Sequence, residues 1–249
     1  MRLLLSNDDG LGAEGLEALE AVAARLGEVW VVAPDRERSA SSHALTMNAP
    51  LRARPAGERR WAVDGTPVDC AYLGVHRLLP ARPDLVLSGI NRGANVGTDV
   101  LYSGTVAVAA EACLMGIPAI ALSMELREGG APRWDTAARA TALVLERLLA
   151  TPLPVGHFLN VNIPDLPFEA IRGVAAARQV RRRYHPRVVT REDPWGKPYH
   201  WIGGPHDAFE DVEDGDGPLI GEGWITVSAL RPQWNDLDAL DAVRGWTDR

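Results

Sequence analysis

Two adjacent carboxylates, Asp8 and Asp9, follow the first apolar run of the chain (residues 3–5) and precede Gly10. A continuous aliphatic run predicts a strand that is buried on both faces, as in a parallel sheet. Open α/β sheets bind their ligands beyond the carboxyl ends of the strands, where these two side chains would lie. Neighbouring carboxylates repel one another unless a cation neutralises them or they share a proton. Because oxygen ligands favour a hard cation, we expect a site for Mg2+ or Mn2+ here.

Two other interpretations of this stretch are open. Residues 7–10, Asn-Asp-Asp-Gly, also suit a plain turn with an N-cap. Gly10, Gly12 and Gly15 spell the G-x-G-x-x-G pattern of dinucleotide-binding proteins, and Asp35 would supply the acid for the ribose. The position of the two carboxylates argues against a dinucleotide, because they stand in front of the first glycine, where a pyrophosphate would approach.

A polar loop at residues 35–43 follows the second predicted strand. Loops beyond strand ends often carry function, and this one holds several hydroxyl groups and His43. Taken alone, the loop fits a solvated, charged linker better than a site.

A second polar region follows the third predicted strand. Residues 89–97 alternate three glycines with Asn91 and Asn95, so the main chain and two amides can approach a metal or a phosphate closely. Residues 103–105, Ser-Gly-Thr, then open an alanine-rich helix whose free N–H groups form a ready anion site. An ordinary serine N-cap explains the helix start equally well. The carboxyl ends of parallel strands share one edge of a sheet, so we expect the carboxylates, the loop and this region to meet.

The elements that must position these groups follow from periodicity. A helical face over residues 14–26, between buried strands at 3–5 and 29–33, forms a βαβ unit and predicts a parallel sheet. Thr66 caps a further helix that runs to about residue 79. Further elements are expected as a hairpin at 51–63, strands at 84–88, 118–124 and 158–163, and helices at 103–115 and 134–149.

The character of the chain changes after about residue 167. Residues 178–200 suit a long hairpin or arm, 223–230 a strand and 236–246 a short terminal helix. We therefore predict a catalytic core at 1–166 and a C-terminal arm at 167–249. The basic run 181–183 fits a solvated hairpin face better than a nucleic-acid or phosphate site. Six of the eight tryptophans fall from Trp134 onward, which suggests that the arm packs against a second subunit.

Composition limits the protein class. With 46% hydrophobic and 24% charged residues, the 249-residue chain has an ordinary globular composition and not a disordered or fibrous one. The formal net charge of -7 disfavours a stable nucleic-acid complex, so an anionic substrate must be held by a local site or a metal. No signal peptide and no membrane-spanning apolar run is visible, so the cytoplasm is expected. Cys70 and Cys113 are expected to be reduced, buried thiols.

Assembled, these residues resemble the SurE (survival protein E) family of metal-dependent 5'-nucleotidases. The resembling stretches are LLLSNDDG (3–10), VVAPDRERSASSHALT (31–46), VDGTPVDCAYLG (63–74), DLVLSGINRGANVGTDVLYSGTVAVAAEA (84–112), GIPAIALS (116–123) and LNVNIP (159–164). The resemblance implies a Rossmann-like three-layer α/β/α fold with a mostly parallel sheet, a C-terminal β-hairpin arm and a terminal helix. It also implies one divalent ion per subunit, hydrolysis of nucleoside 5'-monophosphates in the cytoplasm, and a homodimer or homotetramer that exchanges the arm.

Carried over by position, the resemblance implies that the metal ligands are Asp8, Asp9, Ser39 and Asn91. It likewise implies phosphate contacts from Asn95, Ser103, Gly104 and Thr105. The residues alone lead to the same groups apart from Ser39, which comes from a loop that they leave undecided. The arm departs from the usual family pattern at residues 193–201, which read DPWGKPYHW, so base preference and subunit arrangement transfer less directly than the metal centre.

The predicted reaction is metal-dependent removal of phosphate, with Asp8 and Asp9 as the catalytic carboxylates. One cation would bind a phosphate oxygen and position or activate the attacking water, while the amides stabilise the transferring phosphoryl group. The alternatives are a dinucleotide-dependent oxidoreductase and a nucleotide-binding module without catalytic activity.

Overall fold

The computed structural model describes residues 1–127, 130–185, 187–203, 206–210, 212–234 and 237–246. Its strands are β1 (Arg2–Ser6), β2 (Glu28–Pro34), β3 (Ala53–Gly57), β4 (Arg60–Val63), β5 (Leu85–Arg92), β6 (Ala119–Met124), β7 (Phe158–Ile163), β8 (Gly173–Ala176), β9 (Arg182–Tyr184), β10 (Arg187–Glu192), β11 (Pro198–Gly203), β12 (His206–Phe209) and β13 (Trp224–Leu230). Its α-helices are α1 (Glu14–Ala23), α2 (Pro67–Leu73), α3 (Gly104–Leu114), α4 (Trp134–Ala150), α5 (Asp216–Gly221) and α6 (Leu237–Arg244). Short helical turns are η1 (Gly74–Leu78), η2 (Gly97–Leu101) and η3 (Phe168–Ala170).

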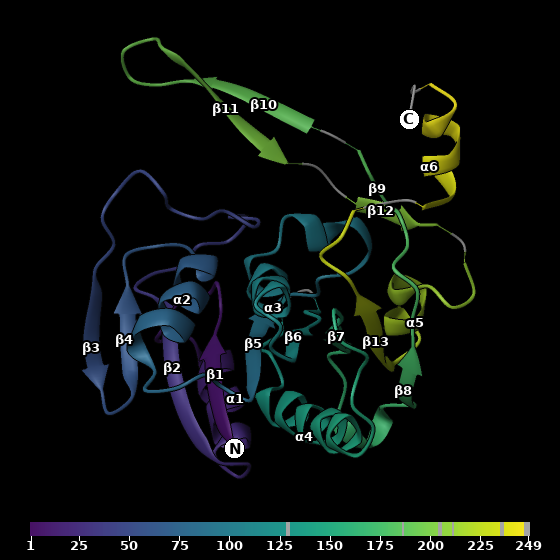
Figure 1. Ribbon diagram of the computed structural model, residues 1–249. Coiled ribbons are helices and arrows are strands. Elements are labelled where there is room, and N and C mark those ends of the chain that lie inside the picture. The colour runs from purple at the N-terminus through teal and green to yellow at the C-terminus, as the bar shows by residue number, and fades with distance from the viewer. Residues whose placement is uncertain (128–129, 186, 204–205, 211, 235–236, 247–249) are drawn as a thin grey trace.

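A nine-stranded sheet in the order β3-β4-β2-β1-β5-β6-β7-β13-β8 forms the centre of the molecule (Figure 1). β1 lies between β2 and β5 and runs parallel to both. In the order of the sheet, the strands β4, β2, β1, β5, β6 and β7 are all parallel. At the two sides of this parallel part, β3 pairs antiparallel with β4 and β13 pairs antiparallel with β7. The α/β class with a mostly parallel sheet, predicted from the sequence, is confirmed.

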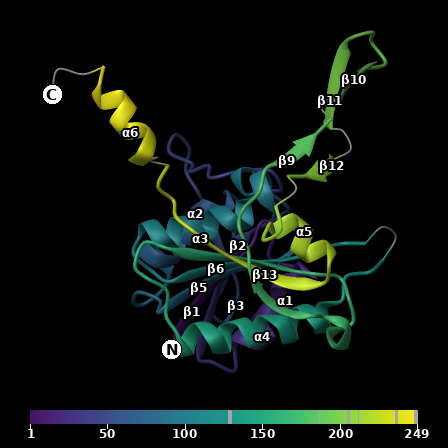
Figure 2. The same cartoon turned by 90° about the vertical axis from the view of Figure 1, so that its right-hand side faces the viewer.

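Two layers of helices cover the sheet. Successive residues of β1 point to opposite faces, so Leu3 and Leu5 join one core while Leu4 joins the other. Helices α1 and α4 pack on the first core, and α2 and α3 on the second (Figure 2). The three leucines are completely buried, as the unbroken apolar run of the sequence indicates.

The strand expected at residues 84–88 is longer than predicted, because β5 continues to Arg92. Its pairing with β6 is irregular between Ser88 and Asn91, after which Asn91 lies opposite Ser123. Gly89 makes this possible, since it has φ +128° and an added Cβ would lie 2.2 Å from the Leu122 carbonyl oxygen. The irregularity brings Asn91 onto the end of a strand instead of into a free loop.

The C-terminal region contributes both to the sheet and to projecting elements. Strands β8 and β13 are part of the central sheet, while the β10–β11 hairpin and α6 project from the body in both views (Figures 1 and 2). The predicted hairpin arm and terminal helix are therefore present. Cys70 and Cys113 are buried free thiols. Among the residues described, no helix has the length and apolar character needed to cross a lipid bilayer.

Candidate active site

The turn after β1 presents the two carboxylates. The Asn7 side chain closes it, since Asn7 Nδ2 donates to the Gly10 carbonyl oxygen at 2.9 Å and Asn7 Oδ1 accepts from Gly10 N at 3.2 Å. Gly10 has φ +100°, a conformation that suits glycine. The plain-turn interpretation therefore describes Asn7 and Gly10 correctly. Because these two residues make the turn, the side chains of Asp8 and Asp9 remain available for other contacts.

Asp8 is buried against the start of α3. Its Oδ1 accepts a hydrogen bond from the Thr105 hydroxyl. An added Cβ at Gly104 would lie 3.0 Å from Asp8 Oδ2, so the first turn of α3 is in close contact with the carboxylate. Burial raises the pKa of Asp8, although the bond from Thr105 opposes this rise. The predicted meeting of this carboxylate with the helix start is confirmed.

Asp9 contacts the end of β5. Its Oδ2 accepts from the Arg92 main-chain N at 3.1 Å, directly after Asn91. Burial, with a smaller contribution from the charge of Asp8, raises the pKa of Asp9 to about 6, against the opposing hydrogen bond from Arg92 N. A positive charge placed between the two carboxylates would lower both pKa values.

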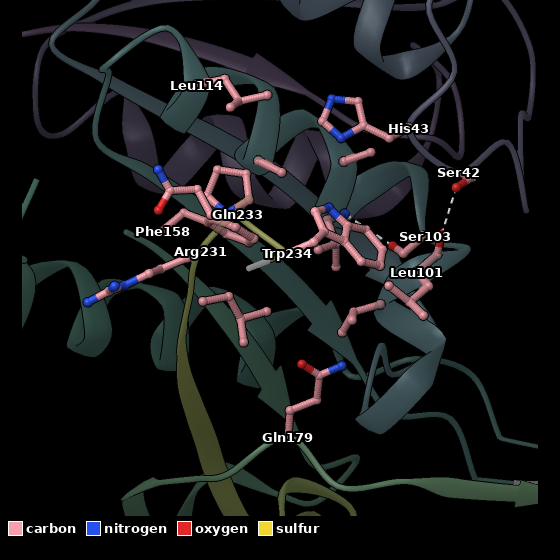
Figure 3. Close-up of a pocket in the computed structure, with 16 residues that line it drawn as sticks. Ser42, His43, Leu101, Ser103, Leu114, Phe158, Gln179, Arg231, Gln233 and Trp234 are labelled. Atoms are coloured by element: carbon pink, nitrogen blue, oxygen red, sulfur yellow. Dashed lines mark hydrogen bonds between the residues drawn. The ribbon is translucent and has the colours of Figure 1, made fainter. Parts of the chain in front are cut away.

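The loop 35–43 lies at the same edge of the sheet. The Arg38 main-chain N donates to the Asp8 carbonyl oxygen at 2.7 Å, which places Ser39 next in the chain to a residue held against the β1 turn. Further along, Ser42 N donates to the Tyr102 carbonyl oxygen at 3.1 Å and the Ser42 hydroxyl to that of Leu101 at 2.6 Å (Figure 3). The loop therefore joins the turn after β1 to the segment before α3 and is held at both ends.

Ser39 and His43 make their own side-chain contacts within this loop region. The Ser39 hydroxyl donates to Glu37 Oε1 at 2.7 Å. His43 Nε2 is 2.8 Å from Glu111 Oε2, two turns into α3. The structure thus ties His43 to the middle of α3, away from the helix start that Thr105 brings to Asp8.

Of the two asparagines predicted from the glycine-rich region, Asn91 lies in β5, the strand next to β1, and Asn95 lies in the segment between β5 and η2. Asn91 Nδ2 donates to the Gly93 carbonyl oxygen at 2.8 Å. Asn95 Nδ2 donates to the Ser123 hydroxyl at 2.8 Å, and Ser123 is the residue of β6 that pairs with Asn91. Ser103 Oγ accepts from Val106 N at 3.1 Å, so Ser103 is the N-cap of α3. The Ser103 hydroxyl hydrogen is not used in this bond. The main-chain N–H groups of Gly104 and Thr105 face the Asp8 carboxylate and oppose the rise of its pKa, as a helix start does beside an anion.

An apolar cavity of about 490 Å³ adjoins the start of α3 (Figure 3). Ser103, Val106 and Ala107 form one wall, and Leu101 of η2 and Trp234 contribute to the others. Because Ser103 borders both this cavity and the α3 start, the cavity opens next to the predicted phosphate site.

Sequence reasoning missed a group of buried polar residues that hydrogen-bond to the segment containing Asn95. Asn160 and Asn162 on β7 and Asp216 on α5 are at most 1% exposed, and they hold the loop between β5 and η2. A signal was present in the sequence, because asparagine alternates with apolar residues in an otherwise buried strand at 158–163. The basic run 181–183, which we interpreted as a solvated hairpin face, is only partly solvated, because Arg182 forms an ion pair with Asp99 of η2.

Comparisons with known proteins agree on one family. The model of the family described as Survival protein SurE matches residues 3–186. The 5'-nucleotidase SurE of Pelobacter propionicus is 46% identical over 246 residues, covering 99% of each chain. That of Gemmatimonas aurantiaca is 48% identical over 250 residues, covering 99% of this chain and 98% of the relative. The crystal structure of the SurE protein from Aquifex aeolicus superposes with a TM-score of 0.87 at 38% identity and covers 100% of both chains.

Proposed function

The chain belongs to the SurE family and is a 5'-nucleotidase, and we propose that it hydrolyses nucleoside 5'-monophosphates with a divalent cation held by Asp8, Asp9, Ser39 and Asn91. The observation that carries this proposal is that the turn after β1 holds the buried Asp8 against the start of α3 and the half-buried Asp9 against the end of β5. Asp8 contacts Thr105 of that helix, and Asp9 contacts the main chain beside Asn91.

The donor set fits a hard cation. All four proposed ligands offer oxygen atoms, which suits Mg2+ or Mn2+ better than a softer metal. Within the described residues, neither Asp8 nor Asp9 has an arginine, lysine or histidine side chain at ion-pair distance, and burial raises the pKa of both. A bound cation would therefore stabilise the charged forms. When bound, it supplies Lewis-acid chemistry, drawing charge from a phosphate oxygen and favouring deprotonation of a water molecule.

The chain itself would hold the phosphoryl group at the start of α3. We assign the N–H groups of Gly104 and Thr105, the Ser103 hydroxyl and the Asn95 carboxamide to its oxygens. Most catalysis of phosphoryl transfer comes from positioning and from stabilising charge on these oxygens, and donors fixed in advance need no reorganisation. The Thr105 bond to Asp8 supports this assignment, because it joins a proposed metal ligand to a residue of the proposed phosphate site.

The dinucleotide alternative finds no support in its own residues. Gly15 is required for packing, because an added Cβ would lie 2.0 Å from the Ile90 carbonyl oxygen. Asp35, the acid expected to bind a ribose, is 3.6 Å from Arg54 Nη1 and 3.9 Å from Arg36 Nε. A nucleotide-binding module without activity differs from our proposal only in turnover, which an assay decides.

We further propose that residues 1–166 act as the catalytic core and 167–249 as an arm exchanged within a cytoplasmic homodimer or homotetramer. Large apolar side chains on the arm support exchange, since Ile202 is 90% and Trp201 62% exposed. The net charge of -7 is unfavourable for a stable nucleic-acid complex. Light scattering coupled to size-exclusion chromatography tests the assembly, and a monomer at micromolar concentration would contradict it.

The function is tested by phosphate release from nucleoside 5'-monophosphates and p-nitrophenyl phosphate with Mg2+ or Mn2+. Chelation should abolish turnover, and Asp9→Asn should lower kcat/KM by about 100-fold or more. Asp35→Asn is the matched control, because Asp35 follows the neighbouring strand β2 and should leave activity intact. Undiminished turnover after chelation, or equal activity of the two variants, would refute the metal site. Tight nucleotide binding by calorimetry without phosphate release would favour the binding module.

A further inference from the structure

The face of β7 that lies beneath Asn95 is polar although it is buried. Asn160 and Asn162 alternate with Leu159, Val161 and Ile163, which belong to the opposite core. The neighbours of Asn162 on this face are polar as well, because Asn162 pairs with Ser123 of β6 and with Thr226 of β13. All of these polar residues are at most 1% exposed. Burying amides costs free energy unless they form hydrogen bonds, so the bonds that they make are informative.

The two asparagines direct their hydrogen bonds to one residue. Asn162 Oδ1 accepts from the Asn95 main-chain N at 2.7 Å, and Asn162 Nδ2 donates to the Asn95 carbonyl oxygen at 3.1 Å. Asn160 Nδ2 donates to the same carbonyl oxygen at 2.8 Å. A single carboxamide, that of Asn162, therefore satisfies both polar groups of the Asn95 main chain, as a neighbouring strand would.

This pairing fixes a residue that has no regular structure of its own. Asn95 lies between the end of β5 at Arg92 and the start of η2 at Gly97. Its side chain is held separately, through the bond from Nδ2 to the Ser123 hydroxyl. An amide nitrogen carries two hydrogens, so the second Nδ2 hydrogen is available to a ligand. With main chain and side chain both held, this donor has a fixed direction before any ligand arrives.

We propose that Asn162 is a positioning residue for the reaction: by pairing with the main chain of Asn95, it holds the Asn95 carboxamide where it donates to the transferring phosphoryl group. Asn162 has this role only if Asn95 binds phosphate, as the proposed function requires. It does not touch the substrate, and it acts entirely through Asn95.

A double-mutant cycle separates positioning from a general effect on folding. Asn162→Leu keeps the side-chain volume but removes both bonds to Asn95. Asn95→Ala removes the carboxamide directly. Thr226→Val is the matched control, because Thr226 lies opposite Asn162, is equally buried, and its hydroxyl has no hydrogen-bond partner among the described residues. Each protein is measured for kcat and KM with AMP at saturating Mn2+, for the Kd of Mn2+ by calorimetry, and for its thermal midpoint.

We expect Asn95→Ala to lower kcat/KM by about 100- to 1,000-fold, as for loss of one transition-state donor. Asn162→Leu should lower it by about 10- to 100-fold, mainly in kcat, because the donor is displaced. The double variant should be no worse than Asn95→Ala alone, since Asn162 then has no carboxamide to position. The Kd of Mn2+ in Asn162→Leu and the activity of Thr226→Val should stay within about twofold of the unaltered protein.

Wild-type activity in folded Asn162→Leu would overturn the positioning role. Losses that multiply in the double variant would overturn it too, because they would show an effect independent of Asn95. Full activity in Asn95→Ala would instead refute the phosphate contact that the proposed function assigns to Asn95. The role of Asn162 would then be refuted as well. If Asn162→Leu does not fold, Asn160→Leu removes only the bond to the Asn95 carbonyl oxygen, and the same lack of additivity is expected with a smaller loss.

Discussion

Replacing Gly104 with alanine perturbs the contact between α3 and Asp8 without removing any hydrogen-bonding group. The added Cβ would lie 2.8 Å from both Asp8 Cβ and Pro67 Cγ, and 3.0 Å from Asp8 Oδ2. Carbon atoms in contact are separated by about 3.5–4.0 Å, so the gap is short by roughly 1 Å. Neither neighbour is the end of a flexible chain, since one belongs to the β1 turn and the other opens α2.

The consequences differ for stability and for activity. Overpacking costs about 1–3 kcal/mol of unfolding free energy, and the higher helix propensity of alanine returns up to about 1 kcal/mol. The thermal midpoint should therefore fall by only a few degrees, at roughly 2–4 °C per kcal/mol for a chain of this size. Activity should suffer far more, because a displacement of about 1 Å in a catalytic group costs about 100-fold in rate.

The assay compares Gly104→Ala with Gly12→Ala, which lies after the same β1 turn and whose added Cβ meets nothing within 4 Å. Hydrolysis of AMP and the Kd of Mn2+ are measured for both proteins at a temperature where both are folded. We expect Gly12→Ala to match the unaltered protein and Gly104→Ala to lose turnover and bind Mn2+ more weakly. A folded Gly104→Ala protein with normal turnover and normal Mn2+ affinity would refute the assignment of Asp8 to the site.

Two further predictions concern stability. Gly15→Ala should lower the unfolding free energy by at least about 2 kcal/mol, because the new Cβ would lie 2.0 Å from the Ile90 carbonyl oxygen and α1 would have to move away from the sheet. A thermal midpoint within a degree of that of the unaltered protein would contradict this packing. Burial raises the pKa of Asp216 above that of the unfolded chain, so its contribution to stability is present at low pH and lost as pH rises from about 4 through the raised value. In thermal melts from pH 4 to 7, the difference in thermal midpoint between the unaltered protein and Asp216→Asn should therefore shrink as pH rises. A difference that grows with pH would show that folding lowers the pKa of Asp216 instead of raising it.

Local patterns were enough to predict most elements. The strand at 158–163 coincides with β7, and the hairpin at 51–63 corresponds to the antiparallel pair β3 and β4. Thr66 caps α2 through reciprocal bonds with Asp69, as its place before proline indicates. These features depend on residues only a few positions apart, and the sequence contains that information directly. The meeting of the polar segments at one edge also followed, because parallel strands align their carboxyl ends.

The sequence did not reveal where the later strands join the sheet. Residues 223–230 read as a strand, yet only the structure places β13 between β7 and β8, antiparallel to the first and parallel to the second. The periodicity of a strand reports which face is buried but not which neighbour it pairs with. Ser39 likewise depended on family resemblance, since nothing in its loop distinguishes it from the neighbouring hydroxyls.

By itself, the sequence determined that two carboxylates, several amides and a helix start would share the carboxyl edge of a parallel sheet. Only the tertiary structure decided which of them touch: Asp8 with Thr105, 97 residues away, Asp9 with the Arg92 main chain, and Asn95 with Asn162, 67 residues away. The physical reason is that such contacts depend on the order of strands in the sheet and on how closely a helix packs on it. Both result from the packing of the whole chain, so a local pattern can mark a residue such as Asn162 as unusual but does not tell which residue it contacts.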